Sequence, residues 1–126
     1  MGQPMGTLRV LVVEDDVMIA TLLAELLTDM GHVCSIESTE AGAVATAARW
    51  RPQLMIVDVK LGAGSGVAAV EAITRHERAP TPHVFISADI STVAADRPDA
   101  VAIQKPFRES DLVRAMRRAV EGLTIH

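Results

Sequence analysis

Short apolar runs alternate with longer amphipathic stretches along the whole chain. Five of the runs are nearly continuous, as in strands that are buried on both faces of a sheet. They cover Leu8–Val13, Val33–Ile36, Leu54–Val57, His83–Ile86 and Val101–Ile103. Because a helix-like stretch follows each run, the pattern predicts an α/β fold: a five-stranded parallel sheet, doubly wound, with helices on both faces.

The stretches between the runs predict helices whose apolar stripes face the sheet. In the first stretch the apolar positions recur at steps of three and four residues, and they comprise Ile19, Leu22, Leu23, Leu26, Leu27 and Met30. Gly31 is expected to end this helix in a left-handed conformation. The later helices are expected to turn inward Ala41, Val44, Ala45 and Ala48, then Val67, Val70 and Ile73, and finally Leu112, Met116, Ala119 and Leu123.

The connections carry cap and turn residues. Either Ser38 or Thr39 is suited to cap the second helix, because a hydroxyl oxygen can accept from the free N–H groups of its first turn. A mobile loop is predicted after the third strand from three closely spaced glycines: Gly62, Gly64 and Gly66. Any helix between positions 88 and 99 is expected to be short, since that stretch has little helical pattern and contains Pro98.

Composition narrows the class of protein. With 126 residues, 49% of them hydrophobic and 22% charged, the chain makes one globular domain, expected at 7–126 after a disordered tail at 1–6. The net charge of −4 and the lack of a basic stripe argue against a nucleic-acid partner. No apolar stretch approaches the ~20 residues that cross a membrane. The single cysteine, Cys34, fits a reducing cytoplasm.

Charged side chains follow three of the predicted strands where those strands end. Glu14, Asp15 and Asp16 follow the first strand, Asp58 follows the third, and Lys105 follows the fifth. The carboxyl ends of parallel strands share one edge of a sheet, so these groups should converge. Two carboxylates about 4 Å apart repel by roughly 4 kcal/mol at an effective dielectric near 20, so the cluster needs a cation. Oxygen ligands favour a hard one.

Taken in order, these residues resemble the receiver domain of bacterial two-component response regulators, of the stand-alone, single-domain type. The matching pieces lie within positions 7–122 and are Val12-Val13-Glu14-Asp15-Asp16, Asp58, Ser87-Ala88 and Lys105-Pro106-Phe107. The resemblance implies a flavodoxin-like sheet with strand order 2-1-3-4-5. It also implies a phosphoprotein of a phosphorelay, in which Asp58 accepts a phosphoryl group from a phosphohistidine with Mg²⁺ as cofactor.

The resemblance also assigns the metal ligands. Asp15 would bind Mg²⁺ directly, and Glu14 would act mainly through water. Asp58 and the backbone carbonyl of Lys60 would complete the protein ligands, which suits an ion that keeps several waters. Asp16 could join this site, but is better suited to cap the first helix.

Two further residues are assigned to the phosphoryl group. Ser87 would donate a hydrogen bond to it, and Lys105 would pair with it, with a cis peptide bond to Pro106. Phosphoryl transfer needs little from a protein beyond a nucleophile, positioning and charge neutralisation, so these residue types fit the chemistry. Ala102 takes the place of an aromatic residue that swings inward on activation in many family members, so it cannot supply that switch.

The expected function is that of a phosphoacceptor rather than an enzyme. A histidine kinase or histidine phosphotransfer protein would donate the phosphoryl group. The face formed by the last two helices and the fifth strand would contact a downstream protein target, and the chain would be a monomer or weak homodimer. Two alternatives stay open: a phosphorylation-independent interaction module, or a Mg²⁺-dependent phosphohydrolase. Such hydrolases usually carry a second acid two residues beyond the nucleophile, where this chain has Lys60.

Overall fold

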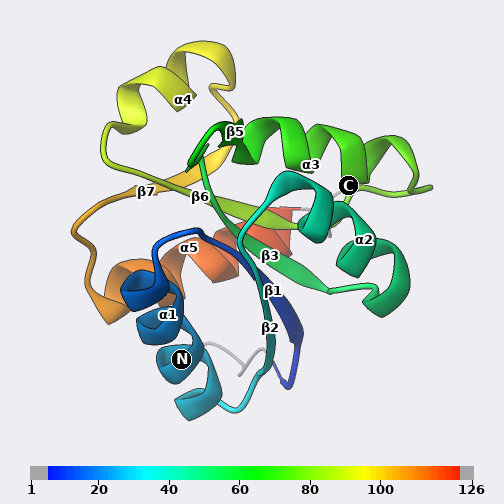
Figure 1. Ribbon diagram of the computed structural model, residues 1–126. Coiled ribbons are helices and arrows are strands. Elements are labelled where there is room, and N and C mark those ends of the chain that lie inside the picture. Colours follow the sequence, from blue (N-terminus) through cyan, green and yellow to red (C-terminus); the bar gives the residue numbers. More distant parts are fainter. Residues whose placement is uncertain (1–5, 123–126) are drawn as a thin grey trace.

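A five-stranded parallel sheet forms the middle layer of the computed structural model, which describes residues 6–122 (Figure 1). Its strands are β1 (Arg9–Val13), β2 (Val33–Glu37), β3 (Leu54–Asp58), β6 (His83–Ser87) and β7 (Val101–Gln104). Their order in the sheet is β2-β1-β3-β6-β7. This confirms the predicted order 2-1-3-4-5, because β6 and β7 are the fourth and fifth strands of the sheet. Most of the predicted tail 1–6, and Leu123, lie outside the described residues.

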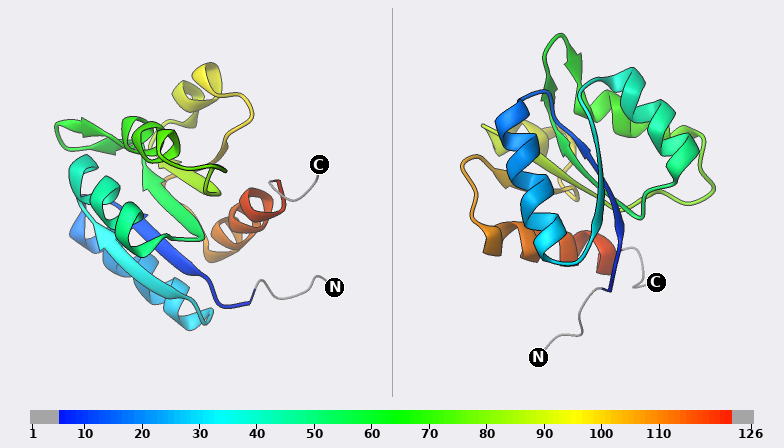
Figure 2. Two further views of the ribbon diagram at one scale, coloured as in Figure 1. Left: turned by 90° about the vertical axis from the view of Figure 1, so that its right-hand side faces the viewer. Right: turned by 60° about the horizontal axis from the view of Figure 1, so that its bottom comes forward.

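Within residues 6–122, five helices cover the sheet on both faces (Figures 1 and 2). They are α1 (Val17–Asp29), α2 (Glu40–Trp50), α3 (Gly66–Arg75), α4 (Ile90–Asp96) and α5 (Glu109–Gly122). Helices α1 and α5 pack on one face of the sheet, and α2 and α3 pack on the other together with Val93 of α4. Among residues 6–122, no helix is long and apolar enough to span a membrane.

The strands bury alternate residues in two separate cores. Val10 and Val12 of β1 face α1 and α5, whereas Leu11 and Val13 face α2 and α3. All four side chains are fully buried. Successive side chains of a strand point to opposite faces, so a strand covered on both faces must be apolar at every position. This is why the strands appear in the sequence as continuous apolar runs.

Helix α1 confirms part of its predicted stripe. Leu23 and Leu27 are buried, as is Ala20, but Leu22 is 47% exposed. Six apolar positions in one helix span a wider arc than the sheet can cover, so the flank of the stripe faces outward. Val17 and Met18 in its first turn are exposed as well, at 77% and 83%.

The predicted inward stripe of α2 is wrong at three of its four positions, and of the four only Val44 packs against the core. The buried residues are Ala43, Thr46 and Ala47, whereas three of the four predicted ones, Ala41, Ala45 and Ala48, are exposed. Alanines on several faces give little contrast between inside and outside. The polar residue Thr46 also lies on the buried face, which a hydrophobic pattern does not predict. It can be buried because its hydroxyl donates to Glu37 Oε2 at 2.6 Å.

The glycine-rich segment after β3 is a small hairpin rather than an irregular loop. Strands β4 (Lys60–Leu61) and β5 (Gly64–Ser65) pair antiparallel, and Gly66 already belongs to α3. Gly66 is buried against the end of β3: a Cβ atom there would lie 1.9 Å from the Asp58 carbonyl oxygen. Only a glycine fits at this position.

The other predicted caps and breaks are confirmed. Thr39, not Ser38, caps α2 by accepting from the Gly42 N–H at 3.0 Å. Gly31 follows α1 with a φ of +93°. Helix α4 has only seven residues and ends before Pro98, as the sparse helical pattern predicted.

Candidate functional site

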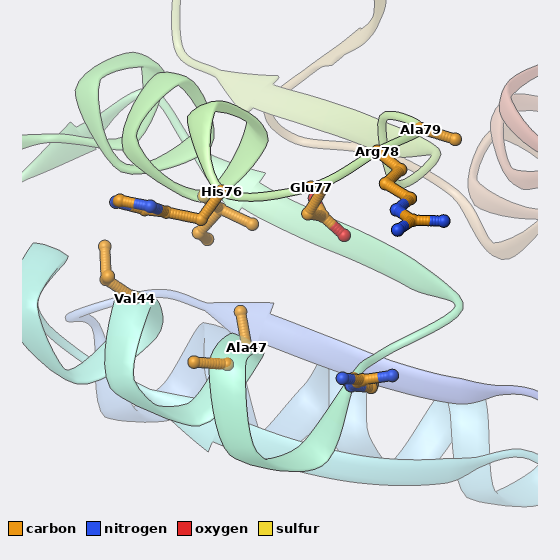
Figure 3. A pocket seen from close by; sticks show the side chains of 9 residues that line it. Val44, Ala47, His76, Glu77, Arg78 and Ala79 are labelled. Atoms are coloured by element: carbon orange, nitrogen blue, oxygen red, sulfur yellow. The ribbon is translucent and has the colours of Figure 1, made fainter.

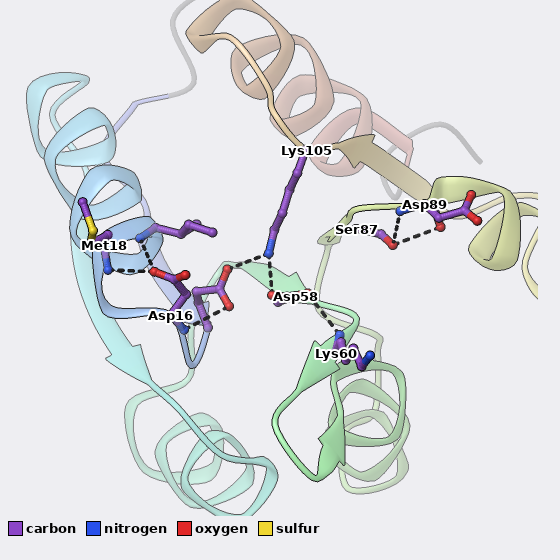
Figure 4. Close-up of polar contacts among 9 residues, drawn as sticks. Asp16, Met18, Asp58, Lys60, Ser87, Asp89 and Lys105 are labelled. Carbon is purple, nitrogen blue, oxygen red and sulfur yellow. Dashed lines mark hydrogen bonds and ion pairs between the residues drawn. The ribbon is translucent and has the colours of Figure 1, made fainter.

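The candidate site lies where β1, β3 and β7 end (Figure 4). Glu14 directly follows β1, and its backbone N–H donates to the Glu37 carbonyl at 2.9 Å. Asp58 is the last residue of β3. Lys105 directly follows β7, and its N–H donates to the Ser87 carbonyl at 2.8 Å. The backbone ladder of the sheet therefore fixes the starting point of each side chain.

Lys105 joins the two buried acids. Its Nζ lies 2.7 Å from Asp58 Oδ2 and 3.1 Å from Glu14 Oε1. Glu14 is 2% exposed and Asp58 is 6% exposed, so the ion pairs are shielded from water and stronger than surface pairs. The predicted cis bond between Lys105 and Pro106 is present.

The carboxylates of three acids lie close enough together to bind one metal ion. One carboxylate oxygen each from Glu14, Asp15 and Asp58 lies within 4.8 Å of the others. Asp15, unlike the other two, is exposed to solvent. An all-oxygen set that is open on one side suits Mg²⁺, which binds a few carboxylates and keeps waters in its remaining positions.

The third acid of the run, Asp16, has a separate structural role. It is the N-cap of α1, and its Oδ1 accepts from the N–H groups of Met18 at 2.9 Å and Ile19 at 3.1 Å. The interpretation of Asp16 as a helix cap is therefore confirmed.

Lys60 contributes a backbone contact to the site, since its N–H donates to Asp58 Oδ1 at 3.0 Å while its side chain is exposed.

The two buried acids differ in charge state. Burial raises the pKa of Glu14, and the neighbouring Asp58 raises it further, to about 7 from an ordinary 4.5, although Lys105 acts the other way. Burial also pushes the pKa of Asp58 upward, but hydrogen bonds from Glu14 and Lys105 outweigh it and the pKa falls below its ordinary value. The pKa of Lys105 is raised, because its bonds to both acids outweigh its burial. Asp58 is thus held as a carboxylate, the form required of a nucleophile.

Ser87 reaches the same sheet edge but points away from the acids. Its hydroxyl donates to the Asp89 carbonyl at 3.0 Å and accepts from the Asp89 N–H at 3.1 Å (Figure 4). Asp89 in turn caps α4 by accepting from the Ser91 N–H. Ser87 is therefore engaged at the start of α4 and makes no hydrogen bond to Asp58.

Side-chain parity explains which residues meet. Two residues of each of the strands β1, β3 and β7 face α1 and α5: Val10 and Val12, Leu54 and Ile56, and Val101 and Ile103. Two positions after the second residue of each pair lie Glu14, Asp58 and Lys105, so these three side chains point to the same face. Phe85 faces the opposite core, and two residues on lies Ser87. The direct contact between Glu14 and Lys105 was not predicted from the sequence. This parity within the apolar runs is the signal that would have found the contact.

A cavity of about 710 Å³ lies elsewhere, between α2 and α3 (Figure 3). Val44, Ala47 and Ile73 form apolar walls, and charged residues of the following turns lie at its rim. One of these, Glu77, is already bonded to the Thr81 hydroxyl at 2.6 Å. The cavity therefore lacks a cluster of acids comparable to the one at the sheet edge.

Comparison with known proteins agrees with this geometry. Residues 10–117 match the family described as the response regulator receiver domain. The transcriptional regulatory protein PdtaR of Mycobacterium tuberculosis is 34% identical over 115 residues, which cover 89% of this chain and 56% of PdtaR. The nitrogen assimilation regulatory protein NtrX of Azorhizobium caulinodans is 32% identical over 122 residues, which cover 92% of this chain and 27% of NtrX.

Solved structures give the same result. The solution structure of the PhyR response regulator REC domain of Erythrobacter litoralis matches with a TM-score of 0.84 at 29% identity, and the match covers 98% of each chain. The present chain spans only about half the length of PdtaR (56%). Since the family match extends over most of the chain and the acids and lysine of the site meet at one sheet edge, this protein belongs to the response regulator receiver domain family.

Proposed function

We propose that this protein is a phosphoacceptor that receives a phosphoryl group on Asp58 in the presence of Mg²⁺. The observation that carries the proposal is the buried contact of Lys105 with Asp58, at 2.7 Å, beside the acids Glu14 and Asp15. A nucleophile, a fixed cation and a set of metal ligands are the parts that phosphoryl transfer requires.

In the proposed reaction, a carboxylate oxygen of Asp58 attacks the phosphorus of a phosphohistidine. The phosphorus–nitrogen bond breaks, its electron pair stays on the imidazole, and an acyl phosphate forms on Asp58. Lys105 keeps Asp58 ionised beforehand and pairs with the phosphoryl oxygens afterwards. Asp15, Asp58 and the Lys60 carbonyl would hold Mg²⁺, with Glu14 acting mainly through water, and the ion would supply positive charge that offsets charge on the phosphoryl oxygens.

Ser87 would carry the signal away from the site. To donate to a phosphoryl oxygen, its hydroxyl must give up the hydrogen bond that it donates to the Asp89 carbonyl. Because Asp89 caps α4, this exchange would loosen the start of a helix whose one buried residue is Val93. The proposed switch therefore acts through α4 and does not require an aromatic residue at Ala102.

Two surfaces suit the expected partners. Val17, Met18 and Leu22 expose apolar side chains on α1 beside the site, where a histidine kinase or histidine phosphotransfer protein could present its phosphohistidine. A cavity of about 300 Å³ lies on the face formed by α4, β7 and α5, and Ala102, Ile103 and Arg114 help to line it. We propose this second face as the contact for a downstream protein target, in the cytoplasm.

The test is to incubate the protein with Mg²⁺ and acetyl phosphate and to measure its intact mass. One added phosphoryl mass is expected, which should disappear with Asp58→Asn or with EDTA. Asp29→Asn is the matched control, because it removes an exposed acid at the other end of α1. This variant should be modified like the wild type.

The alternatives make different predictions in the same experiment. A receiver-like module that acts without phosphorylation would gain no mass at any Mg²⁺ concentration. A phosphohydrolase would release phosphate steadily from simple esters. Neither result is expected. Asp15, Asp58, Ser87 and Lys105 are all present, which argues against the module, and Lys60 stands where such hydrolases carry their second acid.

A further inference from the structure

The acceptor hairpin, defined as residues 59–65, lies beside the proposed phosphorylation site. It follows Asp58 directly, and Lys60 pairs with Ser65 across it. Its base is fixed by backbone bonds: the Val59 N–H donates to the Ile86 carbonyl at 3.0 Å, and the Gly66 N–H donates to the Val59 carbonyl at 2.8 Å. The rest of the hairpin needs a separate support, because two-stranded hairpins are barely stable alone.

That support comes from Glu40, the first residue of α2. Its Oε1 accepts from the Ser65 backbone N–H at 2.5 Å. Within the described chain, no other hydrogen bond joins residues 60–65 to a segment outside 58–68. Gly64 makes room for this contact, since a Cβ atom there would lie 2.8 Å from Glu40 Oε1. Helix α2 and the hairpin lie side by side in Figure 2 (right).

The turn of the hairpin faces the acid cluster. Gly62 has a φ of +54°, and a Cβ atom there would lie 3.5 Å from Asp15 Oδ2. The hairpin is thus placed between α2 and the exposed acid of the site. It also contains Lys60, whose carbonyl is a proposed metal ligand. A shift of the hairpin would move that carbonyl and the turn together.

We propose that Glu40 is a positioning residue, whose carboxylate holds the acceptor hairpin beside Asp15 and thereby sets the Mg²⁺ affinity of the site. This inference rests on the proposed function, because it takes Asp15, Asp58 and the Lys60 carbonyl as the ligands. Without Glu40, the Ser65 N–H bonds to water and the hairpin samples several positions. Part of the free energy of Mg²⁺ binding is then used to order the hairpin, which weakens the affinity for the ion.

The test compares three variants in the metal-free, unphosphorylated protein. Glu40→Ala removes the acceptor and the charge, whereas Glu40→Gln removes the charge and keeps an acceptor oxygen. Glu25→Ala is the matched control, because it removes an exposed acid from α1. Calorimetry measures the dissociation constant for Mg²⁺, and nuclear magnetic resonance measures hydrogen exchange of the Ser65 amide.

For Glu40→Ala, we expect the dissociation constant for Mg²⁺ to rise about tenfold, as for loss of one charge-assisted hydrogen bond. The Ser65 amide should exchange faster, while amides of the β3 strand stay protected. Glu40→Gln should restore both readouts to within about threefold of the wild type. Glu25→Ala should change neither.

The inference would be overturned if Glu40→Ala bound Mg²⁺ as tightly as the wild type. Equal losses in Glu40→Ala and Glu40→Gln would also overturn it, since charge alone would then be responsible. Failure of the proposed function appears elsewhere, in a wild-type protein that binds Mg²⁺ but accepts no phosphoryl group. The comparison among the variants would still decide the role of Glu40.

Discussion

At the scale of single residues, the charge of the site is set by the ammonium group of Lys105 and by one proton that a neighbouring acid can bind. Lys105 contacts both Glu14 and Asp58, yet the pKa of Glu14 is about 7 while that of Asp58 is lowered. One cation cannot offset two buried carboxylates fully. Without metal, Glu14 therefore keeps a proton at mildly acidic pH and loses it near neutrality.

The raised pKa of Glu14 predicts a pH-dependent stability. The folded protein binds this proton more tightly than the unfolded chain, so stability of the metal-free protein should fall as pH rises from 4.5 to about 7. The shifts of Asp58 and Lys105 act outside this range, below their ordinary 3.8 and above 10.5 respectively. In Glu14→Gln the fall should be absent.

Thermal unfolding in EDTA at pH 5 and pH 7.5 checks this. The melting temperature of the wild type should drop by roughly 7–9 °C relative to Glu14→Gln across that interval. His32, whose pKa is lowered by burial, titrates in both proteins, so the difference isolates Glu14. Parallel curves for the two proteins would contradict the assignment.

At the scale of elements, the carboxyl end of β3 and the start of α3 are packed without space between them. A Cβ atom at Gly66 would lie 1.9 Å from the Asp58 carbonyl oxygen and 2.6 Å from Val57 Cγ1. The helix that follows the acceptor hairpin therefore packs directly against the backbone of Asp58, the proposed acceptor. Any side chain at Gly66 must move one of them.

Gly66→Ala is accordingly expected to destabilise the protein by about 1–3 kcal/mol, as overpacked substitutions do. Gly122→Ala is the control, because that position in α5 has no atom within 4 Å of a new Cβ. Alanine there should be neutral or gain up to ~1 kcal/mol of helix propensity. Urea unfolding measures both variants, and similar values for the two would refute the close packing at Gly66.

Two elements differ from what the sequence pattern predicted: helix α2 and the segment after Asp58. The strong apolar stripe of α1 predicted correctly that Leu23 and Leu27 are buried. In α2, alanines lie on several faces, so the sequence shows no difference in hydrophobicity between the buried face and the exposed one. The position of Thr46 depended on a distant partner, Glu37, which no local pattern reveals. The glycines after Asp58 indicated a loop, whereas strand pairing places Gly62 and Gly64 in a hairpin, and Gly66 begins α3.

At the scale of the whole molecule, the apolar runs and intervening helices predicted a parallel sheet, and the resemblance to receiver domains supplied its strand order. The convergence of Asp15, Asp58 and Lys105 followed from the parallel sheet, because the carboxyl ends of its strands share one edge. Ser87 was expected at the same edge, but the direction of its hydroxyl could not be predicted. That direction depends on a turn of three residues at the start of α4.

The convergence of acids predicts that Mg²⁺ stabilises the whole fold. An ion that binds only the folded protein adds about 2.7 kcal/mol at a hundredfold excess over its dissociation constant, or roughly 8 °C in melting temperature for a domain of this size. Asp15→Asn should lose most of this gain while keeping its metal-free melting temperature, because Asp15 is exposed. Melting curves with Mg²⁺ and with EDTA measure both effects, and an equal gain in Asp15→Asn would exclude Asp15 as a ligand.

The span of the Lys105–Glu14 contact has a consequence for how the protein matures. These two side chains are separated by 91 positions in the sequence, and closing so long a loop is a late step, since its entropy must first be offset by other contacts. A nascent chain still lacking β7 on the ribosome carries the acids without their ammonium. The proposed phosphoacceptor site is therefore complete only after β7 and Lys105 have been synthesised and have folded beside the acids.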